Sequence, residues 1–412
     1  MPFVSLSFKI HLPYRLRKTG GEASYRGHYF DDTAAKQAAD HLAAECWLPA
    51  NKILAAQIKK NAGRFKVAFS MSGTTIELLN KLRPDVIRSF RKLAETGCVE
   101  FFAETSHHSV SWLYSKNEFR NQVEQHHKLV RETFGIEPVI FRNTELLYSN
   151  ELAVCIKEMG YKGIFCEGHE RILQGRAVNQ VYAAPGNDDF PVLLRNEQLS
   201  NDIAFRFDDP HWNEQPLTAD KFASWIRSQE EGVSNIFLDY ETFGVHKKPA
   251  SGILAFLQHL PEAIIKDERS GFVTPGEATE KFYPAGLYDV PGTVSWKDTD
   301  KSCCVWNGNA MQHNALRKVY GLEAMVRQSG IPGAVESWQR LQSTDFFCNM
   351  CRNDAGEGGC RSSNPYMDAS IAYQHYMEIL TDFEIMLIRK GLTDIRTAYN
   401  KDNTALVHST LF

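Results

Sequence analysis

The sequence lacks the features that would place the protein in a membrane or on a nucleic acid. No window approaches the ~18 apolar residues that a membrane-spanning helix needs. Residues 1–18 contain neither a basic segment followed by a long apolar run nor a cleavage site of small residues. No basic stripe is present, and acidic and basic residues are interspersed at a net charge of −4. We therefore expect no membrane and no nucleic acid among its partners.

Paired cysteine motifs are also scarce. The nine cysteines are an odd number, and a chain of 412 residues is too long to depend on disulfides for its stability. We expect reduced thiols and a cytoplasmic location. One CxxC unit occurs, Cys348 to Cys351, whereas a zinc ribbon requires two. Free thiols are therefore expected here and at Cys303, Cys304 and Cys360, with a structural zinc site as the alternative. No metal or other cofactor is predicted for the functional site.

Apolar residues, by contrast, are abundant enough for a large core. They make up 43% of the chain and include 25 Phe, 15 Tyr and 7 Trp, which is more than a disordered or fibrous chain carries. The length exceeds that of a usual single domain, so we expect one large domain and a smaller one.

Short apolar runs alternate with longer amphipathic ones as far as about residue 265. Runs typical of strands occupy residues 3–10, 65–70, 98–104, 138–142, 163–167, 192–195 and 235–239. Helical patterns occupy residues 33–47, 74–95 (interrupted by Pro84), 116–135, 149–160 and 218–232. This alternation predicts parallel βαβ units, and about seven repeats predict an irregular (β/α)7 barrel of the TIM type. A doubly wound open sheet is the competing fold, but no Gly-rich phosphate loop follows the first strand.

The pattern changes to helices from about residue 285. Residues 318–347 read as helical with a break from Gly330 to Pro332, and residues 365–390 read as one long helix. We expect residues 1–285 to form the barrel and residues 286–412 to form a helical domain packed on it that adds residues to its site.

Polar side chains follow four of the predicted strands, at the point where each strand ends. They are His11 after the first strand, Glu100 and Glu104 with His107 and His108 at the third, Arg142 and Glu145 at the fourth, and Asp239 and Glu241 at the seventh. In parallel βα folds the carboxyl ends of the strands face one opening. One such cluster is more often a helix cap or an ion pair, but four at one rim indicate a site. The pair His126 and His127, on a helical pattern, is predicted to lie on a solvated face.

Two carboxylates on separate strands, with histidines and aromatic rings around them, are typical of glycosidic bond cleavage. One carboxylate attacks the sugar or supports its positive charge, and the other donates a proton to the leaving oxygen. Arg142, three residues before Glu145, would keep that carboxylate ionised. Asp239 and Glu241 would raise each other's affinity for protons, with Glu241 directed the same way if the extended backbone continues. Trp296 is the candidate for a platform on which a sugar stacks.

The same segments resemble glycoside hydrolase family 57, and specifically its α-amylase branch. The segments IHLPYRL, VEFFAETSHHS, IFRNTELLYS and FLDYETFG, with a weaker match at LQSTDFFCNM, are similar to the motifs of that family in order and spacing. The resemblance spans most of the chain. It implies a (β/α)7 barrel followed by a helical region, and an enzyme that acts on α-glucans such as malto-oligosaccharides, starch or glycogen with retention of configuration.

The resemblance also implies roles for individual residues. Glu145 matches the catalytic nucleophile and Asp239 matches the general acid/base. Positions associated with substrate binding match His11, Glu100, His108, Glu241 and Asp345, to which the strand-end positions add Glu104, Arg142 and Trp296. Phe346 follows Asp345 where the branch carries a His, which puts substrate preference in question.

Three alternatives remain open from the sequence. A 4-α-glucanotransferase would use the same two carboxylates, with a sugar hydroxyl in place of water. A non-catalytic glycan-binding relative would usually lack one of them, and both are present. A metal-dependent deacetylase needs an Asp and two His ligands, and the adjacent pair His107 and His108 is poorly placed to chelate one ion. No motif determines the oligomeric state.

Overall fold

The computed structural model describes residues 2–18, 27–267, 270–296, 304–352 and 364–409. The chain divides into two compact units. The first consists of Met1–Pro13, Thr33–Cys303 and Ala355–Glu357, and the second of Tyr14–Asp32, Cys304–Asp354 and Gly358–Phe412. In this division Tyr14–Asp32, predicted as part of the barrel, belongs to the second unit, and the chain from residue 286 to Cys303, predicted as part of the helical domain, belongs to the first. The predicted domain boundary stays a prediction.

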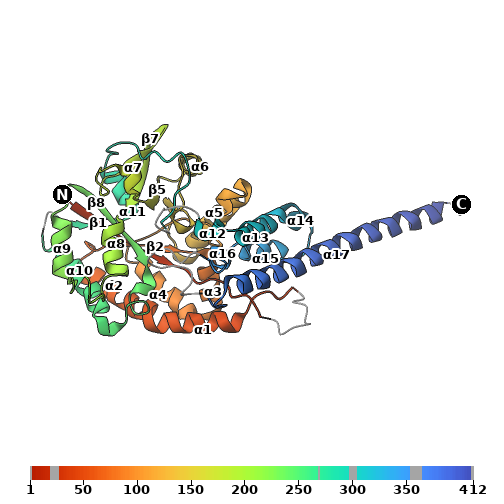
Figure 1. Cartoon of the computed structure of the whole chain (residues 1–412), viewed down its shortest axis with the longest axis horizontal. Helices are drawn as coiled ribbons and strands as arrows, with labels where there is room; N and C mark the ends of the chain where they lie inside the picture. The colour runs from red at the N-terminus through yellow and green to blue at the C-terminus, as the bar shows by residue number, and fades with distance from the viewer. Residues whose placement is uncertain (1, 19–26, 268–269, 297–303, 353–363, 410–412) are drawn as a thin grey trace. The chain divides into compact units, whose positions relative to one another are not determined.

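Seven parallel strands form the centre of the first unit (Figure 1). Their order is β3 (Val99–Phe101), β2 (Val67–Met71), β1 (Pro2–Ile10), β8 (Gly232–Asp239), β7 (Asn187–Arg195), β5 (Gly163–Glu167) and β4 (Ile140–Arg142). A parallel bridge between Ala103, just after β3, and Phe141 in β4 joins the two outer strands. The sheet therefore closes on itself, and the predicted (β/α)7 barrel is confirmed.

Two further strands were not predicted. The strand β6 (Tyr182–Ala184) pairs antiparallel with β7, and β9 (Gly271–Phe272) pairs parallel with β1. Each has three residues or fewer, which is too short to show a periodic pattern in the sequence.

The strand β1 has two buried faces of different character. Val4, Leu6 and Phe8 are apolar, whereas Ser5, Ser7 and Lys9 alternate with them and are also buried. The ring of Phe8 contacts Phe69, Tyr240 and Phe243. The polar face ends at Lys9, near the carboxyl end of the strand.

Aromatic rings fill the centre of the barrel. Phe102, Phe165 and Phe237 come from three different strand segments, and their ring centroids lie 5.3 to 6.2 Å apart. They belong to one buried apolar cluster with Leu146 and Leu193. The barrel is therefore a packed core and not a pore.

The helices of the first unit are α1 (Asp32–Leu42), α2 (Leu48–Lys60), α3 (Gly73–Leu82), α4 (Pro84–Ala94), α5 (Lys116–Phe134), α6 (Asn150–Glu158), α7 (Glu170–Leu173), α8 (Glu197–Ala204), α9 (Ala219–Arg227), α10 (Ile253–Ile265) and α11 (Pro275–Lys281). A π-helical turn, Ala43–Trp47, joins α1 to α2. Pro84 begins α4, because proline lacks the N–H that an interior position would need but fits the first helical turn. Ser72, Ser115 and Ser149 cap the helices that follow β2, β3 and β4.

The second unit is mainly helical. It contains α12 (Cys304–Asn307), α13 (Ala310–Gly321), α14 (Glu323–Gln328), α15 (Ala334–Arg340), α16 (Thr344–Cys348) and α17 (Ala369–Ser409), the long helix that reaches the C-terminal region (Figure 1). The predicted break near Gly330 separates α14 from α15. The buried rings of Trp338, Tyr376 and Phe347 form part of its core.

The cysteine prediction needs one correction. Cys348 is disulfide-bonded, so the expectation of free thiols is wrong at this position. Cys46, Cys98, Cys155, Cys166 and Cys351 form no disulfide, and Cys303 and Cys360 lie outside the described residues. Over the described ranges, no group of three or more His, Cys, Asp or Glu side chains is arranged to hold a metal ion.

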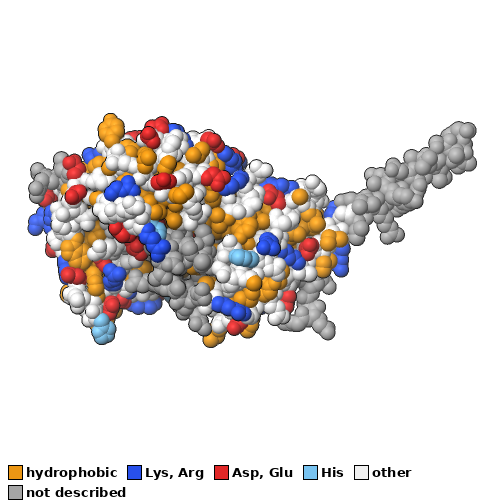
Figure 2. Space-filling view, turned by 45° about the horizontal axis from the view of Figure 1, so that its top comes forward, with side chains coloured by type: hydrophobic (Ala, Val, Ile, Leu, Met, Phe, Trp, Pro, Cys, Tyr) orange, Lys and Arg blue, Asp and Glu red, His pale blue; other side chains and the backbone are white. Residues whose placement is uncertain are grey.

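The molecular surface is mixed in charge. Figure 2 shows Lys and Arg side chains intermingled with Asp and Glu over the described part of one face. None of the helices in the described ranges combines the length and the hydropathy that crossing a membrane requires.

Candidate active site

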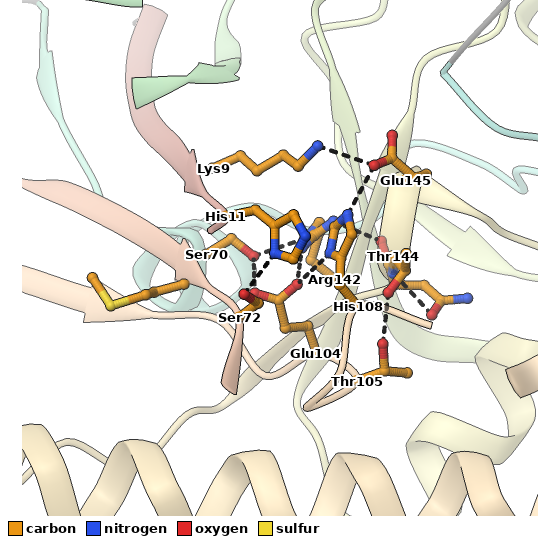
Figure 3. A network of polar contacts seen from close by, with 12 residues as sticks. Lys9, His11, Ser70, Ser72, Glu104, Thr105, His108, Arg142, Thr144 and Glu145 are labelled. Carbon is orange, nitrogen blue, oxygen red and sulfur yellow. Dashed lines mark hydrogen bonds and ion pairs between the residues drawn. The ribbon is translucent and has the colours of Figure 1, made fainter. Parts of the chain in front are cut away.

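Glu145 lies at the carboxyl end of β4, and three hydrogen-bond donors surround its carboxylate. Lys9 Nζ donates to Oε1 at 3.0 Å, and His108 Nε2 lies 2.8 Å from the same oxygen. Trp296 Nε1 donates to Oε2 at 2.7 Å. Figure 3 shows the Lys9 and His108 side chains directed at Glu145. Since only 4% of the Glu145 side chain is exposed, these donors take the place of water around a buried carboxylate.

The backbone of this site is strained. Glu145, Leu146 and His108 have φ angles of 54°, 53° and 52°, in the left-handed region that non-glycine residues seldom adopt. Each such residue costs on the order of 1–3 kcal/mol and persists where surrounding contacts determine the conformation. Two of the three, His108 and Glu145, contact each other. Such strain is concentrated at active sites, so the backbone points to the same residues as the side-chain contacts.

Asp239 is the last residue of β8 and pairs in register with Lys9 of β1. Its Oδ1 lies 3.8 Å from Lys9 Nζ. Since Glu145 Oε1 lies 3.0 Å from the same nitrogen, the two carboxylate oxygens are at most about 7 Å apart. The Asp239 side chain is 40% exposed. The site therefore holds one buried carboxylate and one that solvent reaches.

Glu104 and Arg142 form a buried ion pair next to His108. Arg142 Nε donates to Ser70 Oγ at 2.8 Å, and Glu104 Oε2 lies 3.7 Å from His108 Nδ1. Burial opposes ionisation of Glu104, but Arg142 and His108 lower its pKa to about 2. With 1% of each side chain exposed, both residues support His108, and a contact of either with substrate stays a prediction.

His11 directly follows the last residue of β1 and lies two positions after Lys9. Its ring stacks on that of His108 at a centroid distance of 3.9 Å and an angle of 22°. His11 Nδ1 lies 2.7 Å from Ser72 Oγ, which also accepts a hydrogen bond from Thr75 N as the cap of α3. The end of β1 and the start of α3 thus position this imidazole beside the one that contacts Glu145.

Glu241 follows Asp239 but does not continue its extended direction. Tyr240–Thr242 is a 3-10 turn, so the extended backbone that would direct Glu241 the same way as Asp239 does not continue. Trp47 Nε1 donates to Glu241 Oε1 at 3.0 Å. Burial, and then the charge of Asp239, raise the pKa of Glu241 to about 8. The predicted rise in proton affinity within this pair therefore occurs at Glu241.

Glu100 does not join the other carboxylates. Its oxygens accept the Gly276 N–H at 2.9 and 3.1 Å, at the amino end of α11. Burial raises the pKa of Glu100 to about 7. Glu100 precedes Glu104 by four residues on the same strand segment, or about 13 Å at the rise of a strand. Substrate binding by Glu100 stays a prediction, and the contact that the structure shows for it is with the amino end of α11.

Lys9, Arg195 and Glu167 also lie at the strand ends and were not predicted from the sequence. Arg195 Nη1 pairs with Glu167 at 3.2 Å, and both residues are buried at the ends of neighbouring strands. The guanidinium of Arg195 lies 5.2 Å and the ammonium of Lys9 lies 5.3 Å from the ring of Trp296. A lysine in an otherwise apolar or small-residue strand is a signal that could have revealed Lys9, because burying an unpaired charge is costly.

His126 was expected to be solvated and is instead fully buried. Its Nδ1 accepts the Glu104 N–H at 3.2 Å, and its Nε2 lies 2.8 Å from the Met71 carbonyl oxygen. Burial lowers its pKa, so the neutral imidazole bridges the ends of β2 and β3. His126 lies on the buried face of α5 together with Phe119 and Val123.

Asp345 belongs to the second unit, in the first turn of α16. The Ser343 hydroxyl donates to its Oδ2 at 2.6 Å. Its contribution to the site of the first unit stays a prediction.

The comparison with known proteins identifies the family. The family described as Glycosyl hydrolase family 57 matches residues 5–291. The chain belongs to glycosyl hydrolase family 57. A curated protein of Methanocaldococcus jannaschii, provisionally named an alpha-amylase, is 34% identical over 398 residues, which cover 92% of this chain and 84% of that protein. The alpha-amylase of Pyrococcus furiosus is 25% identical over 235 residues, 55% of this chain, and the chain spans 34% of its length.

A solved family 57 structure shares the fold. The branching enzyme of Thermococcus kodakaraensis, in complex with glucose and additives, has a TM-score of 0.68 at 13% identity and covers 94% of this chain and 91% of its own. Membership of family 57 makes this protein a glycoside hydrolase.

Proposed function

We propose that this protein is a retaining α-glucan hydrolase that cleaves α-1,4-glycosidic bonds of malto-oligosaccharides, starch or glycogen in the cytoplasm. The observation that carries the proposal is the pair of Glu145 and Asp239, both within 3.8 Å of the Lys9 ammonium. The resulting upper limit of about 7 Å includes the ~5–5.5 Å that retaining enzymes use. The Methanocaldococcus jannaschii relative, which aligns with 92% of this chain, supports α-glucan as the substrate.

The two carboxylates have environments that suit two different roles. In the first step Asp239 gives its proton to the glycosidic oxygen as the bond between this oxygen and the anomeric carbon breaks, while Glu145 bonds to that carbon. In the second step Asp239 takes a proton from water, whose oxygen attacks the anomeric carbon as the bond to Glu145 breaks. The donors around buried Glu145 hold it for attack, and the exposure of Asp239 lets it reach the leaving group and the water.

Neighbouring side chains would position the sugar. His11 stacks beside His108, and Trp296 presents its ring next to Glu145. Asp345 is proposed to add a carboxylate from the second unit. If a sugar hydroxyl attacked the glycosyl-enzyme instead of water, the protein would be a 4-α-glucanotransferase. The length of the products distinguishes transfer from hydrolysis.

The test is incubation with maltoheptaose of the wild type, Glu145→Gln, Asp239→Asn and the control Lys36→Gln. Lys36 is exposed and pairs with Asp40 on the surface. The proposal is supported if the wild type and the Lys36→Gln control form shorter sugars that proton NMR detects first as α-anomers. Neither carboxylate variant should form them. Products longer than maltoheptaose would assign a transferase, and an inactive wild type would overturn the substrate.

A further inference from the structure

Lys9 is a cation that contacts both proposed catalytic carboxylates: its strand, β1, lies beside the strand of Asp239 and across the barrel mouth from that of Glu145. Its side chain is 10% exposed, with Glu145 Oε1 at 3.0 Å and Asp239 Oδ1 at 3.8 Å. Burial by itself would lower the pKa of Lys9, but attraction to Glu145 and Asp239 outweighs burial and raises it. Lys9 therefore stays an ammonium throughout the working pH range.

The other charged groups near Lys9 are already engaged. Arg142 opposes the Lys9 charge but pairs with Glu104. His108 shares Glu145 Oε1 with Lys9. Glu241, at the side of Asp239, accepts from Trp47, and its pKa of about 8 leaves it mostly protonated near neutral pH. Within the described part of the chain, Glu145 and Asp239 are thus the two anions that contact Lys9.

We infer that Lys9 is a positioning residue that changes its ionic partner during the reaction, from Glu145 before attack to Asp239 in the glycosyl-enzyme. This inference rests on the proposed function, because it requires a covalent intermediate on Glu145. On this inference, the charge of Lys9 determines in which step Asp239 acts as an acid and in which step Asp239 acts as a base.

In the free enzyme Lys9 and Glu145 neutralise each other. The ammonium keeps Glu145 ionised despite its burial and the nearby Asp239, since an opposite charge within ~4–6 Å favours the charged form of a carboxyl group. At Asp239 the attraction of Lys9, 3.8 Å away, is opposed by the repulsion of the Glu145 carboxylate that binds the same ammonium. The Lys9–Glu145 pair therefore opposes the proposed acid role of Asp239 less than Lys9 alone would.

Formation of the ester on Glu145 removes this anion. The charge of Lys9 is now balanced by Asp239 alone, which has just given its proton to the leaving group. Lys9 therefore stabilises Asp239 as the carboxylate that takes the proton from water. The Lys9 cation therefore opposes the acid role of Asp239 only weakly in the first step and supports its base role in the second step.

The experiment compares Lys9→Gln, Lys9→Arg and Trp296→Phe with the wild type on 4-nitrophenyl α-maltoside. The nitrophenolate leaves without needing a proton, so release of the first nitrophenol reports attack by Glu145, and steady-state release reports attack by water. We expect Lys9→Gln to show a burst followed by a steady state about 100-fold slower than that of the wild type, the lower range of general base catalysis. Azide, which attacks without a base, should accelerate that steady state and yield glycosyl azide.

The controls separate charge from packing. Lys9→Arg should restore most of the steady-state rate because it keeps the cation, whereas Trp296→Phe, which removes a donor to Glu145 only, should slow the burst and show no azide effect. Equal loss of burst and steady state in Lys9→Gln without azide rescue would overturn the inference. If Lys9→Gln is unfolded by circular dichroism, the same readouts are taken on Lys9→Met. A wild type inactive on both this glycoside and maltoheptaose would instead overturn the proposed function, and the inference with it.

Discussion

The Lys9 ammonium donates a 3.0 Å hydrogen bond to Glu145 Oε1, although the two residues are 136 positions apart in the chain. The strands that carry them, β1 and β4, are not neighbours in the sheet. The contact therefore crosses the mouth of the barrel and exists because the bridge between Ala103 and Phe141 closes it. Stability of the barrel and geometry of the site are linked through such contacts, which leads to three predictions besides the two experiments above.

The left-handed backbone at His108 predicts an unusual order of stability. His108→Gly and His108→Ala both lose the donor to Glu145, and we expect each to lower kcat/KM by about 10²–10³-fold. His108→Gly should nevertheless be more stable than His108→Ala by about 1 kcal/mol, because glycine adopts a φ of 52° without strain. Urea unfolding of the two variants measures the difference. A more stable alanine variant would show that His108 is not strained.

The buried pair of Arg142 and Glu104 predicts strong coupling. Arg142→Met leaves the Glu104 carboxylate buried without its main partner and is expected to reduce the free energy of unfolding by about 3–5 kcal/mol. The double variant Arg142→Met with Glu104→Gln carries no charge there and should recover a large part of this loss. Guanidinium unfolding of both single variants and the double variant forms the cycle. Additive effects would contradict the pairing.

Glu100 predicts a dependence of stability on pH. Its pKa of about 7 in the folded state exceeds the ~4.3 of an unfolded chain. The contribution of its protonated form is therefore complete below about pH 4 and is lost as the pH rises to 7. Glu100→Gln stays neutral and can still accept the Gly276 N–H. It should match the wild type at pH 4 and exceed it by up to about 3 kcal/mol at pH 8.

Urea unfolding at both pH values tests the Glu100 prediction. The exposed Glu95 provides the control, since Glu95→Gln should change stability equally little at pH 4 and pH 8. If Glu100→Gln were no more stable than the wild type at pH 8, folding would not raise the pKa of Glu100, and the prediction would be contradicted.

Much of the fold was predictable because it follows from local patterns. All seven barrel strands coincide with apolar runs in the sequence, and Pro84 divides α3 from α4 where the pattern indicated. Parallel strands put their carboxyl ends at one opening, which suffices to bring Glu145 and Asp239 to the same rim. The short strands β6 and β9 were missed because two or three residues carry no period.

Residues on one strand or helix were harder to assign. Glu100 and Glu104 differ by four positions, so alternation predicts the same face for both and does not distinguish them. Their separation of about 13 Å along the extended segment leaves Glu104 beside His108 and Glu100 at the amino end of α11. Similarly, His126 and His127 are adjacent histidines on one helix, so residue type does not distinguish them. Only the packing of α5 buries His126.

The sequence by itself determined which side chains reach the ends of the strands, since alternation and strand termination are properties of neighbouring residues. Only the tertiary structure decided which charges meet: Lys9 with Glu145 and Asp239, Arg142 with Glu104, and Trp47 with Glu241. The physical reason is that electrostatic energies depend on distances of a few ångströms between residues tens to hundreds of positions apart. Closure of the barrel and burial set those distances and, with them, the protonation of Glu104 and Glu241.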